Sequence, residues 1–180
     1  MSGDLALPLY AQIMGDRFAQ LPPAVRAVHS APHARQVSGT ATVGSGATPI
    51  ARLIARLAGF PPPGEDVPLR VEFSPANGGE TWRRDFAGDR FVSWIGREGE
   101  LLVERIGPLS FAFELESQPA GLAMRLRGWR LGPIALPLGF APHVEAREWE
   151  DGGRFHFDVS ISPRWIGRMI HYHGWLEVGC

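Results

Sequence analysis

The sequence predicts an α+β protein in which a strongly curved antiparallel sheet closes into a barrel or a cone. Between Asn77 and Gly152 the chain repeats runs that alternate apolar and polar residues, which is the pattern of strands with one buried face. Two-residue turn signals separate these runs, and such turns join antiparallel neighbours. The chain also contains 22 Gly and 16 Pro, a content typical of turn-rich β proteins. A lipocalin-like barrel and a helix-gripping cone both fit this pattern.

Length and composition predict one globular domain with a substantial core. The chain has 180 residues, of which 44% are hydrophobic. We expect a single domain over residues 1–180, with a helical segment at 1–34 and the β-rich part at 35–180. The net charge of −1 gives no reason to expect nucleic acid or a membrane as partner. Cys180 is the only cysteine, and neither a signal peptide nor a membrane span is recognisable, so we expect a cytoplasmic protein.

The first 34 residues predict a pair of helices that lies outside the sheet. Apolar residues at helical spacing indicate a helix over roughly residues 8–20, which Pro22-Pro23 ends. A second short helix can begin at these prolines, and Val25, Val28 and His29 share one of its faces. We expect His29 and His33 to lie at the surface or to cap this helix.

A strand and a third helix precede the repeated turns. Residues 36–43 alternate as a strand does. Thr48 and Pro49 then suit the N-cap and first position of a helix over residues 48–58. We expect this helix to pack on the sheet with its apolar side inward and Arg52 and Arg56 outward; the inward residues are Ile50, Leu53, Ile54 and Leu57.

Five turns predict the inward face of the following strands. Residues directly opposite each other across a hairpin share a face. The expected turns are at residues 77–78, 88–89, 98–99, 107–108 and 118–119. They place Arg84, Ser93 and Glu104 in one cross-strand row, with apolar neighbours on the same face. The other face carries interleaved Arg, Glu and Asp and is expected to be solvated.

Two further segments complete the chain. Residues 128–142 are apolar but contain three prolines, so they do not suit a central strand; we expect them to fold over one end of the sheet, either as a plug on the core or as a lid over a cavity. A turn near Asp151-Gly152 then joins two strands, and residues 168–178 form the last one, with Tyr172 inward.

Four segments resemble a known family. They are Leu21–Arg26, Gly79–Phe86, Glu104–Pro108 and Gly167–Leu176, and the Glu-Thr-Trp-x-Arg-x-Phe stretch is the most specific of them. Together they are similar to a bacterial domain of unknown function, DUF4166, over nearly the whole chain. Members also occur fused behind a dehydrogenase-like domain, so the resemblance implies a dehydrogenase-like protein as a partner. It implies no activity and no catalytic residues.

Polar residues on the inward face are the candidate site. Arg84 is long enough to reach over the small Ser93 to Glu104, since adjacent strands lie ~4.8 Å apart. This pair is either a structural ion pair or the polar floor of a ligand cavity. The candidate ligand-binding residues are Arg84, Trp82, Glu80, Ser93, Phe111, Phe113, Met124 and Tyr172.

Glu148 and Glu104 are the candidate catalytic residues. Glu148 lies among apolar residues with no basic partner assignable on its own face, so it either acts as an acid or base or extends to water at the strand end. His156, His171 and His173 suggest a metal site, but they fall on the face opposite the apolar set. We therefore expect no metal and no other cofactor.

Three functions are compatible with this pattern. The first is a binding domain for a small apolar or amphipathic metabolite, anchored by Arg84 inside the barrel. It predicts an internal or end-opening pocket of a few hundred Å³ with Arg84 and Glu104 at its polar end. The second is a metal-free isomerase, cyclase or decarboxylase in which an inward Glu moves a proton. The third is an interaction domain that docks on a dehydrogenase.

Overall fold

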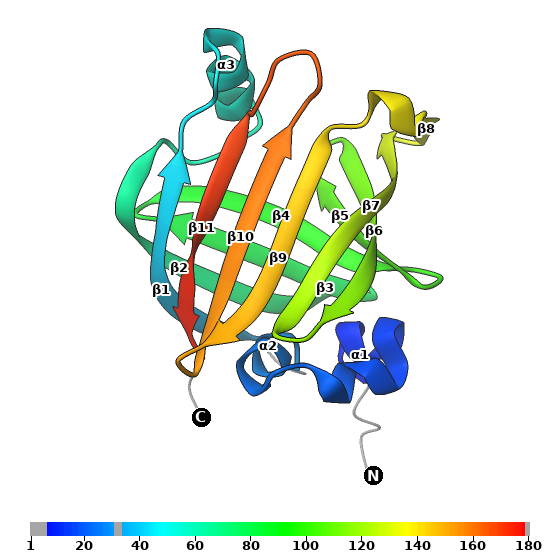
Figure 1. Ribbon diagram of the computed structural model, residues 1–180. Coiled ribbons are helices and arrows are strands. Elements are labelled where there is room, and N and C mark those ends of the chain that lie inside the picture. The colour runs from blue at the N-terminus through cyan, green and yellow to red at the C-terminus, as the bar shows by residue number, and fades with distance from the viewer. Residues whose placement is uncertain (1–6, 31–33, 179–180) are drawn as a thin grey trace.

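The computed structural model describes residues 7–30 and 34–178, and it shows a closed antiparallel β-barrel of ten strands with three short α-helices (Figure 1). The order around the sheet is β6-β5-β4-β3-β2-β1-β11-β10-β9-β7, and β6 pairs with β7 to close it. An extra short strand, β8, pairs only with β7. The predicted barrel is therefore confirmed. The elements, in chain order, are α1 (Leu9–Met14), the 3₁₀ helix η1 (Gly15–Gln20), α2 (Pro23–His29), β1 (Arg35–Gly44), α3 (Pro49–Leu57), β2 (Gly64–Ala76), β3 (Gly79–Phe86), β4 (Asp89–Glu98), β5 (Leu101–Ile106), β6 (Leu109–Gln118), β7 (Gly121–Leu131), β8 (Ile134–Leu136), the 3₁₀ helix η2 (Leu138–Phe140), β9 (His143–Asp151), β10 (Arg154–Ser162) and β11 (Ile170–Glu177).

The predicted faces are right, although three of the five turns are displaced by one residue: the turn after β3 lies one residue earlier than expected, and the turns after β4 and β6 lie one residue later. The turn after β3 is formed by Ala87 and Gly88, both with positive φ (53° and 107°), as the tightest hairpin turns require. Moving a turn by one residue changes each cross-strand partner by two. Because side chains alternate with a period of two, every residue keeps its face. Arg84 thus pairs with Phe91 instead of Ser93, yet all three point inward.

The N-terminal helices cover one end of the barrel instead of lying outside it (Figure 1). Tyr10 and Val25 are fully buried, and α2 packs against β9 and β10. Gly15 adopts a positive φ of 58°, a conformation that glycine tolerates and that ends an α-helix, so the expected single helix over residues 8–20 divides into α1 and η1. We call this the helical end of the barrel.

The opposite end carries α3, the loop of residues 163–169 between β10 and β11, and the β8–η2 segment (Figure 1). We call it the α3 end. The predicted inward face of α3 is wrong: the buried residues are Ala51 and Ala55, whereas Ile50, Leu53 and Leu57 are more than half exposed. The plug interpretation of residues 128–142 is also wrong, because Ile134, Leu138 and Phe140 are exposed; the three residues of β8 form an edge pairing with β7.

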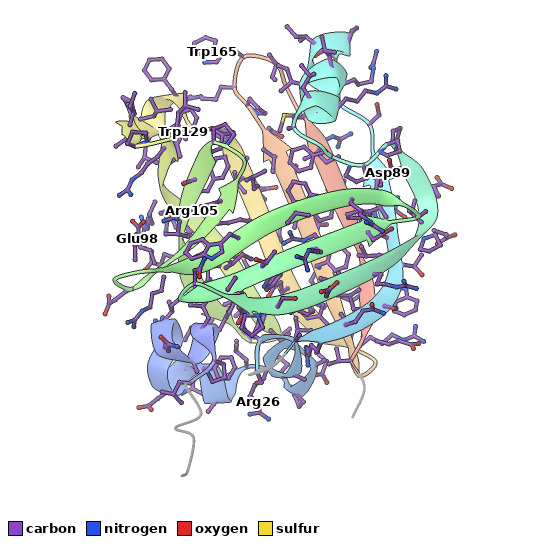
Figure 2. All side chains as sticks on the ribbon, turned by 180° about the vertical axis from the view of Figure 1, so that it is seen from behind. Arg26, Asp89, Glu98, Arg105, Trp129 and Trp165 are labelled. Carbon is purple, nitrogen blue, oxygen red and sulfur yellow. The ribbon has the colours of Figure 1, made fainter. Side chains whose placement is uncertain are left out.

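The outer wall is the solvated charged face that the sequence predicts. Its ion pairs join neighbouring strands, as between Arg83 and Glu72 at 3.0 Å or Arg105 and Glu98 at 3.7 Å. Figure 2 shows Arg105 and Glu98 on the barrel exterior. No helix among the described residues is long and apolar enough to cross a membrane.

Candidate functional site

Arg84 lies inside the barrel at the centre of a polar cluster formed by β3, β4 and β5. Its Nη1 donates to Ser93 Oγ at 2.9 Å, and its Nη2 lies 3.4 Å from Glu104 Oε1. The guanidinium also stacks over the rings of Trp82 and Phe91, at 5.0 and 5.4 Å from their centroids. The expected contact between Arg84 and Glu104 is therefore present, and two aromatic rings pack against the Arg84 guanidinium.

Glu148 has a partner that the sequence reasoning missed. Its Oε2 lies 2.6 Å from Nε2 of His29, whose side chain is fully buried. The alternative in which Glu148 extends to water is wrong, because its side chain is buried and its partner comes from α2 and not from its own sheet face. The surface position expected for His29 is also wrong; His33 lies outside the described residues. Because α2 covers the helical end, the face that carries Val25, Val28 and His29 turns into the barrel. That shared face was visible in the sequence, but its target was not.

His29 and Tyr10 form a stacked aromatic layer next to this pair. Their ring centroids are 3.6 Å apart, and the His29 ring also stacks on Trp82 at 5.7 Å. The buried Tyr10 hydroxyl and His29 Nδ1 have no hydrogen-bond partner among the described residues. A buried polar group of this kind favours a polar atom of a ligand or a water as its partner.

Burial also changes the acidity of both tyrosines. The loss of solvent raises the pKa of Tyr10 well above its ordinary value, and the charge of Glu148 raises it further. Burial raises the pKa of Tyr172 to about 12, an effect that the Arg84 charge partly opposes. Both phenols are therefore neutral hydrogen-bonding groups at physiological pH.

The interior contains two adjacent small cavities instead of one large pocket. Their volumes are about 70 Å³ and about 60 Å³, and both are lined by Trp82, Arg84, Glu148 and Tyr172. Each is room for about two waters at ~30 Å³ per molecule. The expected internal or end-opening pocket of a few hundred Å³ is therefore wrong. The larger cavity nevertheless has the lining predicted for it, since Phe111, Phe113, Met124 and Glu104 line it together with Trp82, Arg84 and Tyr172.

A much larger groove lies outside the barrel wall, where β7 and β9 separate. Its volume is about 1200 Å³. The β7–β9 ladder ends at the pair Met124 and Ala146, and beyond this pair the two strands diverge (Figure 1). The groove shares Met124, Val144, Ala146, Arg147 and Glu148 with the lining of the larger inner cavity. We call this part of the wall the β7–β9 seam.

The remaining predicted residues fall beside this site or away from it. Glu80 accepts a hydrogen bond from Trp82 Nε1 at 2.9 Å, which orients the indole within the stack. His171 faces the outer wall, where it lies 3.2 Å from Asp158, and its ring centroid is 5.3 Å from that of His173. Among residues 7–30 and 34–178 there is no cluster of three or more His, Cys, Asp or Glu side chains that suits a metal ion.

Comparison with protein families matches residues 21–176 to one family, described as Domain of unknown function (DUF4166). The match spans α2 and all the strands of the barrel, including Arg84, Glu104 and Glu148. Searches among curated proteins and among solved structures found no match.

Proposed function

Because the chain belongs to the DUF4166 family, whose description assigns no function, we propose a function from the geometry: the barrel binds a small amphipathic molecule at the β7–β9 seam. The polar group of this molecule enters the inner cavity and contacts Arg84. Its apolar part lies in the outer groove, because the inner cavities of about 60 and 70 Å³ are too small for a whole metabolite, whereas ligand sites commonly measure ~300–1,000 Å³.

The observation that carries this proposal is the shared lining of the groove and the inner cavity. Met124, Val144 and Ala146 line both spaces, together with Arg147 and Glu148. These side chains are small or flexible, so a modest rearrangement joins the spaces. The interior beyond them offers a cation at Arg84, the carboxyl group of Glu148 and the hydroxyl of Tyr10, which has no hydrogen-bond partner in the part of the chain that the structure describes.

Dye binding tests this function. An anionic naphthalene sulfonate dye should bind saturably to the native protein, and Arg84→Gln should weaken that binding about tenfold, the effect of losing one charged hydrogen bond. An uncharged analogue of the dye should be affected much less. Phe111→Trp should weaken both dyes by filling the inner cavity. Arg83→Gln, on the outer face of the same strand, is the matched control and should have no effect.

The outcome distinguishes this site from apolar surface elsewhere. Dye bound at the α3 end is lost in Leu57→Ser, because Leu57 is 80% exposed there, whereas dye bound at the seam is retained. Absence of saturable binding, or equal loss in Arg83→Gln and Arg84→Gln, contradicts the proposal. In that case the docking of a dehydrogenase-like protein becomes the better hypothesis.

A second function, acid–base catalysis without a metal, is favoured by the contact between His29 and Glu148. A carboxylate and an imidazole 2.6 Å apart, beside a cavity, can exchange a proton with each other and with a bound molecule. Metabolites that displace the dye should then be converted by the native protein, with the product detected by mass spectrometry. Glu148→Gln should keep dye binding and abolish conversion; retained conversion in this variant contradicts a catalytic Glu148.

A further inference from the structure

Exposed apolar side chains concentrate at the α3 end of the barrel. Ten large hydrophobic side chains are exposed among the described residues, and only Leu7 and Val92 lie elsewhere. The other eight belong to α3, to the loop of residues 163–169 and to the segment from the end of β7 to η2. We call them the end face: Ile50, Leu53, Leu57, Leu131, Ile134, Leu138, Phe140 and Trp165. Soluble proteins seldom gather so many apolar residues on one surface without a partner.

Hydrogen bonds connect the three segments that carry the end face. The backbone N–H of Ala47 donates to the carbonyl of Arg168 at 2.8 Å, and the Thr48 hydroxyl donates to the carbonyl of Ile166 at 3.1 Å. On the other side of the loop, Arg164 Nη1 donates to the carbonyl of Gly139 at 3.3 Å. The loop is thus tied to α3 on one side and to η2 on the other. Figure 2 shows Trp165 at the tip of this loop, far from Arg26 at the helical end.

The charge of these segments is all of one sign. Residues 44–63, 131–142 and 163–169 contain four arginines and no Asp or Glu, although the whole chain has 19 acidic residues. Arg52, Arg56, Arg164 and Arg168 are exposed, and none of the ion pairs between described residues includes them. The nearest acids in sequence are Glu65 and Asp66, at the start of β2, and Glu145, near the start of β9.

We propose that the end face docks on an anionic lipid bilayer. Helix α3 has the arrangement of an interfacial helix: Ile50, Leu53 and Leu57 form an exposed apolar stripe, while the arginines lie to the side. Such helices bury the apolar stripe ~5–10 Å into the bilayer and place their cations at lipid phosphates. Trp165 at the loop tip provides the aromatic anchor that suits the membrane–water boundary.

This proposal departs from the expectation drawn from net charge, because a net charge of −1 does not report how the charges are distributed. It does not depend on the ligand proposed for the β7–β9 seam. A second copy of the chain is the less favoured occupant, since two identical end faces would bring eight arginines together with no acids between them.

Vesicle sedimentation tests the proposal. The protein should partition onto vesicles that contain phosphatidylserine and phosphatidylcholine, and only weakly onto vesicles of phosphatidylcholine alone. Leu57→Ser should weaken partitioning about tenfold through lost apolar burial. Arg52→Gln and Arg56→Gln should each weaken it about fivefold, and high salt should abolish their contribution. The matched controls are Val92→Ser and Arg70→Gln on the barrel wall, which should leave partitioning unchanged.

Several outcomes would overturn the proposal. They are an absence of partitioning onto phosphatidylserine vesicles, equal partitioning onto both vesicle types, and equal losses in the control variants. Sedimentation velocity without vesicles tests the alternative occupant, since a dimer that Leu57→Ser dissociates would assign the end face to a second copy. All substituted side chains are exposed, and a thermal melt of each variant confirms that it folds.

Discussion

The contact between His29 and Glu148 makes a quantitative prediction about stability. It joins α2 to β9 across 119 residues of sequence, and the exposed fractions of the two side chains are 0% and 8%. Glu148→Leu removes the carboxylate and leaves His29 buried without its partner. Breaking one side of a buried ion pair costs ~3–5 kcal/mol, and losing a charged hydrogen bond costs ~1.5–3 kcal/mol. We therefore expect a loss of about 3 kcal/mol in the free energy of unfolding.

Urea unfolding and a thermal melt measure this change. For a chain of this length, 1 kcal/mol corresponds to ~2–4 °C in Tm, so Tm should fall by about 6–12 °C. The matched control is Glu145→Leu, on the same strand. Glu145 pairs with His143 at the surface, where both side chains are more than half exposed, and its loss should change the free energy by less than about 0.5 kcal/mol.

A double-mutant cycle separates the contact from its surroundings. His29→Leu with Glu148→Leu replaces both polar groups by apolar ones and should recover at least about 1.5 kcal/mol relative to the sum of the single variants. If the two single losses add without recovery, or if Glu148→Leu matches Glu145→Leu, the reasoning about this buried contact is refuted.

Three further predictions concern the interior and the seam. The chain has two tyrosines, and absorbance titration of the folded protein should show neither ionising near pH 10. Because the folded-state pKa of Tyr172 is raised to about 12, its burial stabilises the folded state fully below pH 10, and this contribution is lost as the pH rises toward 12. Ionisation near pH 10 in the folded state would contradict the burial. Glu104→Gln should lower the free energy of unfolding by about 1–2 kcal/mol. This loss is smaller than that from breaking a fully buried ion pair, since the Glu104 side chain is 21% exposed. A change below about 0.5 kcal/mol would mean that the contact between Arg84 and Glu104 does not contribute to stability. Gly121→Ala should lower the free energy of unfolding by more than about 2 kcal/mol, because the added Cβ would lie 1.9 Å from the carbonyl oxygen of Glu148. Gly128→Ala is the control, since its Cβ would meet only the Cβ of Ala112, at 3.9 Å. Equal stability of the two variants in urea would contradict the close packing of the seam.

The amino-acid sequence by itself determined which side chains face the interior of the barrel. Alternation has a period of two and turn signals are local, so even a turn misplaced by one residue left Arg84, Ser93 and Glu104 on the same face. The same local rules predicted the N-cap at Thr48, whose side chain accepts from the N–H of Ala51 at 3.1 Å.

Tertiary structure alone decided what each face meets. The periodicity of α3 showed an apolar stripe but not its target, and packing buried the small Ala51 and Ala55 against the barrel while Leu53 and Leu57 stayed exposed. Likewise, no local rule brings His29 to Glu148, because that contact exists only once α2 covers the helical end. Cavity volume depends on how all the side chains interlock, so the lining of the interior was predictable and its size was not.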